Sequence, residues 1–499
     1  MVFDLREWVS GTHRSAARRF GSLPSDDAHG FSGRRLLNLD TEYDVVVAGA
    51  GFSGLSAAMV LAEAGKKSLV LEAAPTPGGA AAISAGIIWA PETLEKLAGY
   101  VPDGERELQR AYCDTFPEAV DWLIGRGLPL SNPEPLGDLG VGTVMGPGRS
   151  GDRHVFMALM ADAVEQQGGR VVYKCPLGTV ERSPEGHDLV VSAGQGRTVR
   201  ARALILATGG FQGSPELLDR YIGTGAGRRL MLRSVPECTG RGLLAAISLG
   251  AGTSRNLHNL YGHTMPDMAV PIDQLQPLTA YIARQSLILN RTGERFVDES
   301  EGRLEEVNLQ DGWSQPGGVY YLFFDARVYR EYGVDTGISP ALPQLDRVAR
   351  WQKDGACVFQ AQTVEALLSQ LAQREGMDAA GALRSIGEYN EACDHDRAAS
   401  LMPPRCLDAF ALHEPPFFAV RARGGVTATN GGIRIDASCR VLDFDGRRIP
   451  QLYACGVDAG GVFGRTYGGF LGWALASGVL AGRSAVADLA SNGASLERS

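Results

Sequence analysis

Short apolar runs alternate with glycine turns in the first part of the chain. Residues 43–48 are rich in valine and carry no charge after Asp44, which is typical of a buried parallel strand. We expect a helix over 55–65 that ends at a glycine, and a second strand over 68–71 with Glu72 at its carboxyl end. This order predicts one complete βαβ unit.

The same periodicity continues in the next segment. An amphipathic helix is expected over 154–168 and a strand over 169–174. Residues 188–193 and 198–201 are expected to form a hairpin, and 203–207 a further buried strand. These elements extend the α/β pattern of the first segment.

The pattern changes between residues 270 and 415, where charges, prolines and aromatic residues increase. Helices are expected there over 362–373 and 379–393, and a final apolar helix over about 471–488. Because glycine-rich strands return after this stretch, the simplest architecture is one α/β domain interrupted by an inserted cap. The predicted parts are an N-terminal extension (1–40), the two pieces of the α/β domain (41–269 and 416–490), the cap (270–415) and a flexible tail (491–499).

The composition is that of a globular protein, with 44% hydrophobic and 21% charged residues in a chain of 499. A net charge of −9 and the lack of a long basic run argue against nucleic acid as a partner. The eight cysteines are scattered without a CxxC pair, so no metal site is expected. Residues 45–62 are uncharged, but glycines and serines interrupt them, so we expect no membrane span and a cytoplasmic protein.

The turn Gly49-Ala-Gly-Phe-Ser-Gly54 follows the first strand directly. Gly49 permits the tight turn, Gly51 lets the backbone approach a pyrophosphate, and Gly54 allows the helix to pack closely on the strand. The N-terminus of the helix then faces the phosphates, and Glu72 is placed to hydrogen-bond the adenosine ribose. This combination predicts a dinucleotide cofactor.

Other glycine-rich segments favour FAD over NAD. Gly78-Gly79 lies soon after the second strand and leads into Ser84-Ala-Gly86, while Ala454-Cys-Gly456 lies far away in sequence. FAD is long and extended, so its flavin end needs residues remote from the first turn, whereas NAD is usually bound locally. The sequence therefore predicts an FAD protein.

The segment 72–79, followed by Ser84-Ala-Gly-Ile-Ile-Trp-Ala-Pro91, resembles the fumarate reductase and succinate dehydrogenase flavoprotein superfamily, nearest its 3-ketosteroid dehydrogenase branch. Further agreement within about residues 41–490 comes from 207–211, 290–299, 431–436, 449–456 and Gly468-Gly469. The resemblance implies a three-layer ββα FAD-binding (two-dinucleotide-binding) domain with an inserted α+β cap. It also implies chemistry at a carbon–carbon bond beside a carbonyl group.

The glycine motifs and the resemblance together assign the cofactor site. Members with covalent flavin carry a histidine where this chain has Ala80-Ala-Ala-Ile-Ser84, so the FAD is expected to be non-covalent. Relatives bind the ribityl chain with the residue after Gly456; Val457 cannot do so, and Asp458 is expected to replace it. The predicted cofactor-binding residues are Gly49, Gly51, Phe52, Ser53, Gly54, Glu72, Ala73, Gly78, Gly79, Ala80, Ser84, Ala85, Gly86, Thr208, Gly209, Gly210, Gly456, Asp458 and Gly472.

Most of the dicarboxylate clamp of the fumarate reductases is missing. The clamp's histidine and arginine correspond to Ala428 and to Thr466 or Tyr467, and His263 matches another family histidine. A small dicarboxylate is therefore a poor candidate. We expect a mostly apolar ketone such as a steroid, terpenoid or polyketide, with an external electron acceptor or donor that the sequence does not identify.

The candidate catalytic residues are Tyr467, Arg303 and His263. Tyr467 resembles the ketosteroid dehydrogenase tyrosine that polarises the substrate carbonyl, or else it packs on the flavin ring. Arg303 has the spacing of the proton-donating arginine of fumarate reductases, or else it pairs with neighbouring glutamates on the surface. Tyr467 favours dehydrogenation and Arg303 favours ene-reduction; we expect dehydrogenation. Oxidation of a C–OH or C–N bond, for which His263 is the only candidate base, and a non-catalytic flavin-binding subunit remain alternatives.

Overall fold

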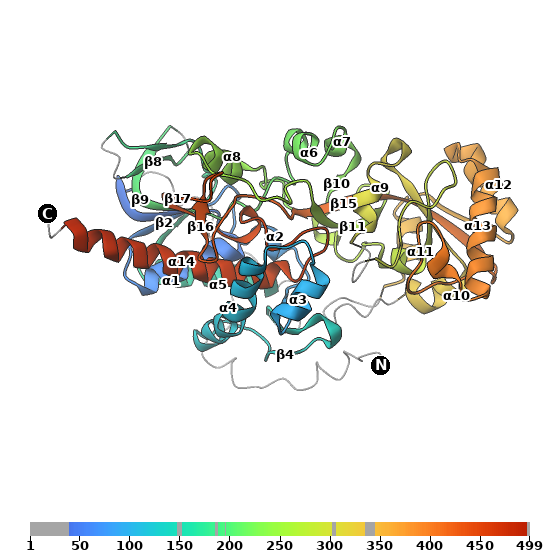
Figure 1. Ribbon diagram of the computed structural model, residues 1–499, viewed down its shortest axis with the longest axis horizontal. Coiled ribbons are helices and arrows are strands. Elements are labelled where there is room, and N and C mark those ends of the chain that lie inside the picture. Colours follow the sequence, from blue (N-terminus) through green and yellow to red (C-terminus); the bar gives the residue numbers. More distant parts are fainter. Residues whose placement is uncertain are drawn as a thin grey trace. The chain divides into compact units, whose positions relative to one another are not determined.

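The computed structural model divides the chain into two compact units (Figure 1). The structure describes residues 39–146, 152–184, 188–194, 196–301, 306–334 and 345–496. Unit 1 contains the described residues up to Ser214, Val235–Asn259 and those from Ala428 onward, and unit 2 contains Pro215–Ser234 and Leu260–Thr427. Unit 2 therefore begins before and ends after the predicted cap, and it includes a separate upstream piece. Residues 1–38, nearly all of the predicted extension, lie outside the described residues, as do 497–499.

Unit 1 is built on a mainly parallel sheet. In this sheet β1 pairs in parallel with β2 and β9, β2 with β6, and β9 with β17. Ala48, Leu71, Leu206 and Ala454 are neighbours in register at the last position of four of these strands, so their carboxyl ends share one edge. The strands in sheet order are β16 (Arg440–Leu442), β17 (Arg448–Ala454), β9 (Thr198–Leu206), β1 (Glu42–Ala48), β2 (Ser68–Leu71) and β6 (Arg170–Val172).

The predicted βαβ unit is confirmed, but the expected break before residue 203 is wrong. β8 (Leu189–Ser192) forms the predicted hairpin with β9, and β9 then continues without interruption to Leu206. Arg202 lies within this continuous strand, and its side chain is 41% exposed and pairs with Asp44 at 3.2 Å. A partly exposed position accommodates a charged residue in an otherwise apolar strand. β7 (Val180–Arg182) adds to the outer side of β8.

The long C-terminal helix α14 (Phe470–Leu496) packs along α1 (Phe52–Glu63) in unit 1 (Figure 1). Glycines make the approach possible, because a Cβ at Gly478 would lie 2.4 Å from the Ser53 carbonyl oxygen. In the described part of the chain, α14 is one helix long and apolar enough to span a membrane by length and composition. Of that apolar window, 61% is buried within the protein.

The other elements of unit 1 are a small antiparallel sheet and several helices. The small sheet joins β3 (Ile87–Ala90), β5 (Val141–Val144) and β4 (Glu134–Pro135). The helices are α2 (Gly79–Ala82), α3 (Leu94–Tyr100), α4 (Arg106–Gly125), α5 (Asp152–Gln166) and α8 (Arg241–Ser248).

Unit 2 is an α+β structure around a six-stranded sheet with β15 at its centre. β13, β14 and the parallel β10 all pair with β15, and β12 pairs with β13. The strands are β10 (Met231–Leu232), β11 (Leu260–Pro266), β12 (Leu287–Leu289), β13 (Tyr320–Phe324), β14 (Val358–Ala361) and β15 (Phe417–Thr429). The helices are α6 (Pro215–Tyr221), α7 (Ala226–Arg229), α9 (Asn308–Gly312), α10 (Ala326–Val328), α11 (Arg347–Lys353), α12 (Val364–Glu375) and α13 (Ala379–Asp394).

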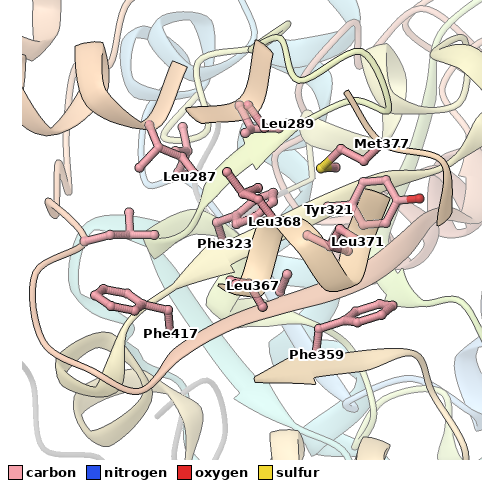
Figure 2. Packing of buried hydrophobic residues seen from close by; sticks show 14 of the residues in the cluster. Leu287, Leu289, Tyr321, Phe323, Phe359, Leu367, Leu368, Leu371, Met377 and Phe417 are labelled. Carbon is pink, nitrogen blue, oxygen red and sulfur yellow. The ribbon is translucent and has the colours of Figure 1, made fainter. Parts of the chain in front are cut away.

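Both faces of the unit 2 sheet are buried, which explains the unbroken aromatic run of β13. Tyr321 and Phe323 point into a cluster with residues of α12 and α13 (Figure 2). Tyr320, Leu322 and Phe324 belong to a second cluster on the other face. Side chains alternate between faces along a strand, so a strand covered on both sides is apolar at every position.

The two helices predicted near the end of the cap are confirmed, with starts set by capping side chains. Thr363 accepts a hydrogen bond from the Ala366 amide at the start of α12. Asp378 accepts from the Ala380 and Gly381 amides at the start of α13. Such caps satisfy backbone donors that a helix cannot satisfy itself. The expected α/β class with an inserted α+β unit is confirmed.

Candidate functional site

The glycine turn after β1 has the geometry of a phosphate cradle. Gly49 has φ +109°, and a Cβ there would lie 2.2 Å from the Ala207 carbonyl oxygen. A Cβ at Gly54 would lie 2.0 Å from the Gly49 carbonyl oxygen. At Gly51, in contrast, a Cβ would meet no atom within 4 Å. Gly49 and Gly54 are therefore required by the fold itself, whereas Gly51 borders open space.

The N-terminus of α1 is available to an anion beside this space. α1 starts at Phe52, has no side-chain cap and has no acidic residue in its first turn. Its first backbone N–H groups therefore remain to bind a phosphate, with a favourable helix dipole.

Glu72 links the glycine turn to the end of β2 through hydrogen bonds. Its side chain is buried, and its carboxylate accepts hydrogen bonds from the Ala50 amide and the Ala74 amide, both at 2.7 Å. Burial raises the pKa of Glu72, and the two backbone hydrogen bonds oppose that rise. Its contact with the ribose stays a prediction.

The second glycine segment lies against the first turn. The Gly78 amide donates to the Ala50 carbonyl oxygen at 2.8 Å, and Gly78 forms a bridge with Gly51. Further on, the Ser84 hydroxyl accepts from the Gly86 amide at 3.0 Å and donates to the Ala81 carbonyl. The structure thus places Gly78 and Gly79 against the turn 49–54, beside the open position at Gly51.

Asp458 holds the two remote segments of the predicted site together. It is buried, and its carboxylate accepts from the Thr208 amide at 2.5 Å, the Thr208 hydroxyl at 2.9 Å and the Gly210 amide at 3.2 Å. Burial raises the pKa of Asp458, and the hydrogen bonds from Thr208 oppose that rise. In this arrangement Asp458 positions the loop 208–210; its predicted ribityl contact stays a prediction.

Gly456, after β17, packs against the start of α1. A Cβ at Gly456 would lie 2.4 Å from the Ser53 hydroxyl of α1. Turns after β1, β2, β9 and β17 therefore meet at one edge of the sheet. Ligands of open parallel sheets bind outside the carboxyl ends of the strands. The backbone donors, the open space at Gly51 and the extended row of turns fit an extended dinucleotide such as FAD.

Tyr467 lies in an aromatic cluster of unit 1. Its half-buried ring contacts Trp89 edge-on at 5.8 Å and stacks on Phe470 at 5.8 Å. The two motifs that resemble the ketosteroid dehydrogenases, around Trp89 and Tyr467, are thus in direct contact. This arrangement places the Tyr467 phenol among aromatic rings.

Tyr112, which no sequence motif indicates, holds this cluster in place through hydrogen bonds to the backbone. The buried Tyr112 hydroxyl lies 2.6 Å from the Trp89 carbonyl oxygen and 2.9 Å from that of Gly469. Burial raises the pKa of Tyr112 well above its ordinary value, so the phenol is a hydrogen-bond donor at any physiological pH. Gly472, predicted to bind the cofactor, packs here: a Cβ would lie 2.2 Å from the Trp89 carbonyl oxygen.

His263 lies on β11 in unit 2 and is buried. Its Nε2 lies 2.9 Å from the Tyr261 hydroxyl, and its ring meets the Tyr281 ring edge-on at 5.5 Å. Burial, helped by the Arg233 charge, holds the pKa of His263 well below its ordinary value. The imidazole is therefore neutral at pH 7 and is a hydrogen-bonding group rather than a cation. Arg303 lies outside the described residues.

Comparison with known proteins agrees with this geometry. A family model described as an FAD binding domain matches residues 44–469. A fumarate reductase (cytochrome) of Shewanella frigidimarina is 27% identical over 470 residues, covering 89% of this chain and 76% of the relative. The 4-oxocyclohexanecarboxylate 2-dehydrogenase of Sinomonas cyclohexanicum is 27% identical over 561 residues, covering 89% and 92%.

Among solved structures, 3-ketosteroid Δ1-dehydrogenase from Sterolibacterium denitrificans is similar in fold. The TM-score is 0.70 at 19% sequence identity, over 90% of this chain and the whole of that one. The resemblance predicted from the motifs is confirmed by these matches, and so is the choice of FAD as the cofactor.

Proposed function

This chain belongs to the FAD binding domain family, and on that premise we propose that it oxidises a CH–CH bond beside the carbonyl of a mostly apolar ketone. The turns at Gly49–Gly54, Gly78–Gly79 and Gly456 would hold FAD, which would supply a two-electron hydride acceptor for the β-carbon, while the α-proton would pass to a base. The reverse reaction reduces the corresponding C=C bond. The coarse part of this function, an FAD-dependent oxidoreductase of CH–CH or C=C bonds, follows from the family and its relatives.

The contact between Tyr467 and Trp89 carries the proposal. The Tyr467 phenol, packed against Trp89, Phe463 and Phe470, is a hydrogen-bond donor among aromatic rings. Such a donor stabilises the negative charge that develops on a carbonyl oxygen when the α-proton leaves. The aromatic rings suit the hydrocarbon part of a ketone better than a second carboxylate.

Dehydrogenation is the direction that we favour. The relative named 4-oxocyclohexanecarboxylate 2-dehydrogenase supports desaturation of a cyclic ketone, and the fumarate reductase relative supports reduction. His263, being neutral, provides no second positive charge for a dicarboxylate. Steroids, terpenoids and polyketides with a ring ketone are the substrate classes to test.

The test is an anaerobic titration of the FAD-loaded protein that follows the visible flavin band. Saturated cyclic ketones and 3-ketosteroids are added to the oxidised protein, and matching enones to the dithionite-reduced protein. Bleaching by a saturated ketone is the expected result. Reoxidation by enones alone would establish an ene-reductase, and bleaching by alcohols or amines alone would refute the proposed reaction.

A further inference from the structure

Arg233 is a buried arginine of unit 2 that directly follows β10. Only 7% of the residue is exposed. Its Nε and Nη2 donate to the Thr279 hydroxyl at 3.1 and 2.9 Å, and Nη2 also donates to the Gln276 side-chain oxygen at 2.5 Å. Nη1 donates to the Thr427 hydroxyl at 2.9 Å. All of these acceptors are neutral.

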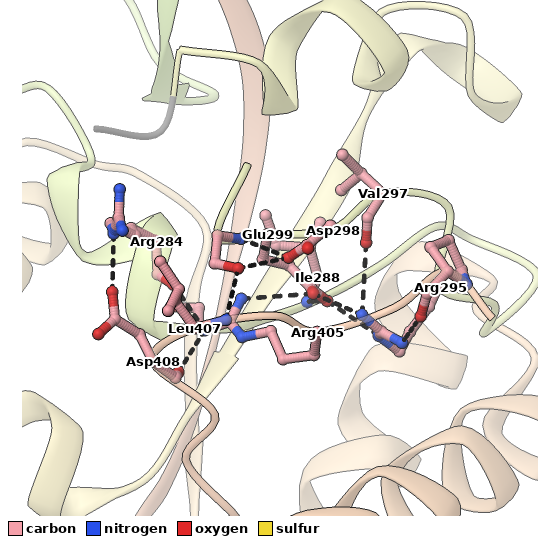
Figure 3. Close-up of polar contacts among 12 residues, drawn as sticks. Arg284, Ile288, Arg295, Val297, Asp298, Glu299, Arg405, Leu407 and Asp408 are labelled. Atoms are coloured by element: carbon pink, nitrogen blue, oxygen red, sulfur yellow. Dashed lines mark hydrogen bonds and ion pairs between the residues drawn. The ribbon is translucent and has the colours of Figure 1, made fainter. Parts of the chain in front are cut away.

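Among the described residues, no ion pair joins Arg233 to a carboxylate, and its hydrogen-bond acceptors are the neutral groups above. Two other arginines of the same unit, whose side chains are buried, do have a carboxylate partner. Arg295 and Arg405 both contact the buried carboxylate of Glu299, at 2.6 and 3.3 Å (Figure 3). Taking a cation out of water is costly unless an anion accompanies it. Within the described part of the chain, the lack of a directly paired carboxylate is thus the unusual feature of Arg233.

The neighbours of Arg233 hold its guanidinium in one orientation. The Thr279 hydroxyl that accepts from Arg233 lies 2.8 Å from the Leu275 carbonyl oxygen, to which it donates. The Gln276 amide lies 2.5 Å from the Tyr281 hydroxyl. A guanidinium has five N–H donors, and the contacts above use four, which leaves one N–H of Nη1 beside the Thr427 hydroxyl. An oriented guanidinium with one remaining N–H donor can bind an anionic oxygen without rearranging.

The same network reaches the predicted site residue His263. Tyr281, which bonds Gln276, packs edge-on against the His263 ring. Arg233 and the buried Glu306 act on the pKa of His263 in opposite directions, so both charges lie within its electrostatic range. Arg233 thus belongs to the polar region that contains His263, rather than to a separate part of unit 2.

We infer that Arg233 binds a carboxylate of the substrate, so that the ketone is an anionic one. The identification of the ligand as the substrate rests on the proposed function. A single guanidinium with neutral hydroxyl neighbours suits one carboxylate on an otherwise apolar molecule. It does not replace the two-carboxylate clamp that this chain lacks, and it narrows the substrate to a keto acid.

A redox-inert probe separates this inference from turnover. We would measure binding of cyclohexanecarboxylate and of neutral cyclohexanecarboxamide to the FAD-loaded full chain by isothermal titration calorimetry. We expect the acid to bind at least about 10-fold more tightly than the amide, the usual effect of a charge-assisted hydrogen bond. Arg233→Gln should weaken acid binding by about 10- to 100-fold and leave amide binding unchanged, and Arg233→Lys should retain part of the preference.

Arg397→Gln is the matched control, because Arg397 is exposed and pairs with Glu391 at the surface; it should bind both probes as the wild type does. Equal affinity for acid and amide in the wild type, no binding of either, or unchanged acid binding by Arg233→Gln would each overturn the inference. If Arg233→Gln does not fold, Arg233→Lys and Thr279→Val decide the question, with thermal unfolding as the check on folding. Because the probes carry no ketone, the flavin titration with ketones tests the proposed reaction independently.

Discussion

Replacing Gly51 with alanine should separate what the fold requires from what the cofactor requires. Gly51 has φ −75°, which alanine adopts readily, and a Cβ there would meet no protein atom within 4 Å. The free energy of unfolding of the cofactor-free protein should therefore stay within about 0.5 kcal/mol of the wild type. Only a ligand against the Gly51 backbone would meet the new methyl group.

The expected loss in FAD affinity follows from the contacts that the methyl group would break. A Cβ holds a pyrophosphate oxygen away from the first N–H groups of α1. Losing one such hydrogen bond to a charged group costs about 1.5–3 kcal/mol, so FAD should bind about 10- to 100-fold more weakly. The assay is titration of the cofactor-free protein with FAD, followed by quenching of flavin fluorescence.

Two other glycines serve as controls for the same substitution. At Gly54 a Cβ would lie 2.0 Å from the Gly49 carbonyl oxygen, so Gly54→Ala should destabilise the protein with or without FAD, by about 1–3 kcal/mol. At Gly99, in α3, a Cβ has free space, so Gly99→Ala should stabilise by about 0.5–1 kcal/mol and leave FAD binding unchanged. Wild-type FAD affinity in Gly51→Ala would refute the placement of the pyrophosphate at Gly51.

Three further predictions concern other parts of the molecule. Tyr467→Phe keeps the aromatic packing but removes the phenol hydroxyl, so the rate of flavin reduction by a ketone substrate, measured by stopped flow, should fall by about 10²- to 10³-fold. A change below about threefold would contradict the role of the hydroxyl as a donor to the substrate carbonyl. Glu299→Ala leaves Arg295 and Arg405 without their shared carboxylate and should destabilise the protein by about 3–5 kcal/mol in urea unfolding, whereas Glu391→Ala at the surface should cost less than about 1 kcal/mol. The lowered pKa of His263 means that, as the pH falls, the unfolded chain takes up a proton there before the folded protein does, so the free energy of unfolding should fall below about pH 6.5. His263→Gln should make the free energy of unfolding less dependent on pH in that range. An unchanged pH dependence would argue against a buried neutral imidazole.

The parts of the fold that follow from short stretches of sequence were predictable. The β1–α1–β2 unit and the caps of α12 and α13 depend on residues a few positions apart, and their patterns are visible in the chain. The length of β9 was not, because this strand lies between β1 and β17, which are remote in sequence, and Arg202 within it pairs with Asp44, 158 residues away. A charge within an apolar run does not by itself show whether it has a partner.

The residues of the candidate site also divide into those that the sequence could predict and those that it could not. Gly49, Gly51 and Gly54 could be assigned roles from their spacing, and the backbone geometry distinguishes the open position from the two packed ones as expected. Tyr112 and Arg233 were missed because their partners are distant: Tyr112 contacts Gly469, and Arg233 contacts Thr279 and Thr427. Neither residue stands in a recognisable motif, and only the folded chain shows its contacts.

The order of the chain has a consequence for how the protein is made. β17 pairs with β9 in the central sheet of unit 1, yet all of unit 2 is translated between the two strands. During synthesis the apolar end of β9, Leu204–Leu206, therefore lacks its β17 partner until residues 448–454 leave the ribosome. Unpaired edges of this kind promote aggregation. Efficient production of the protein should thus depend on chaperones that shield the nascent chain, and on unit 2 folding before the sheet that surrounds it in sequence is complete.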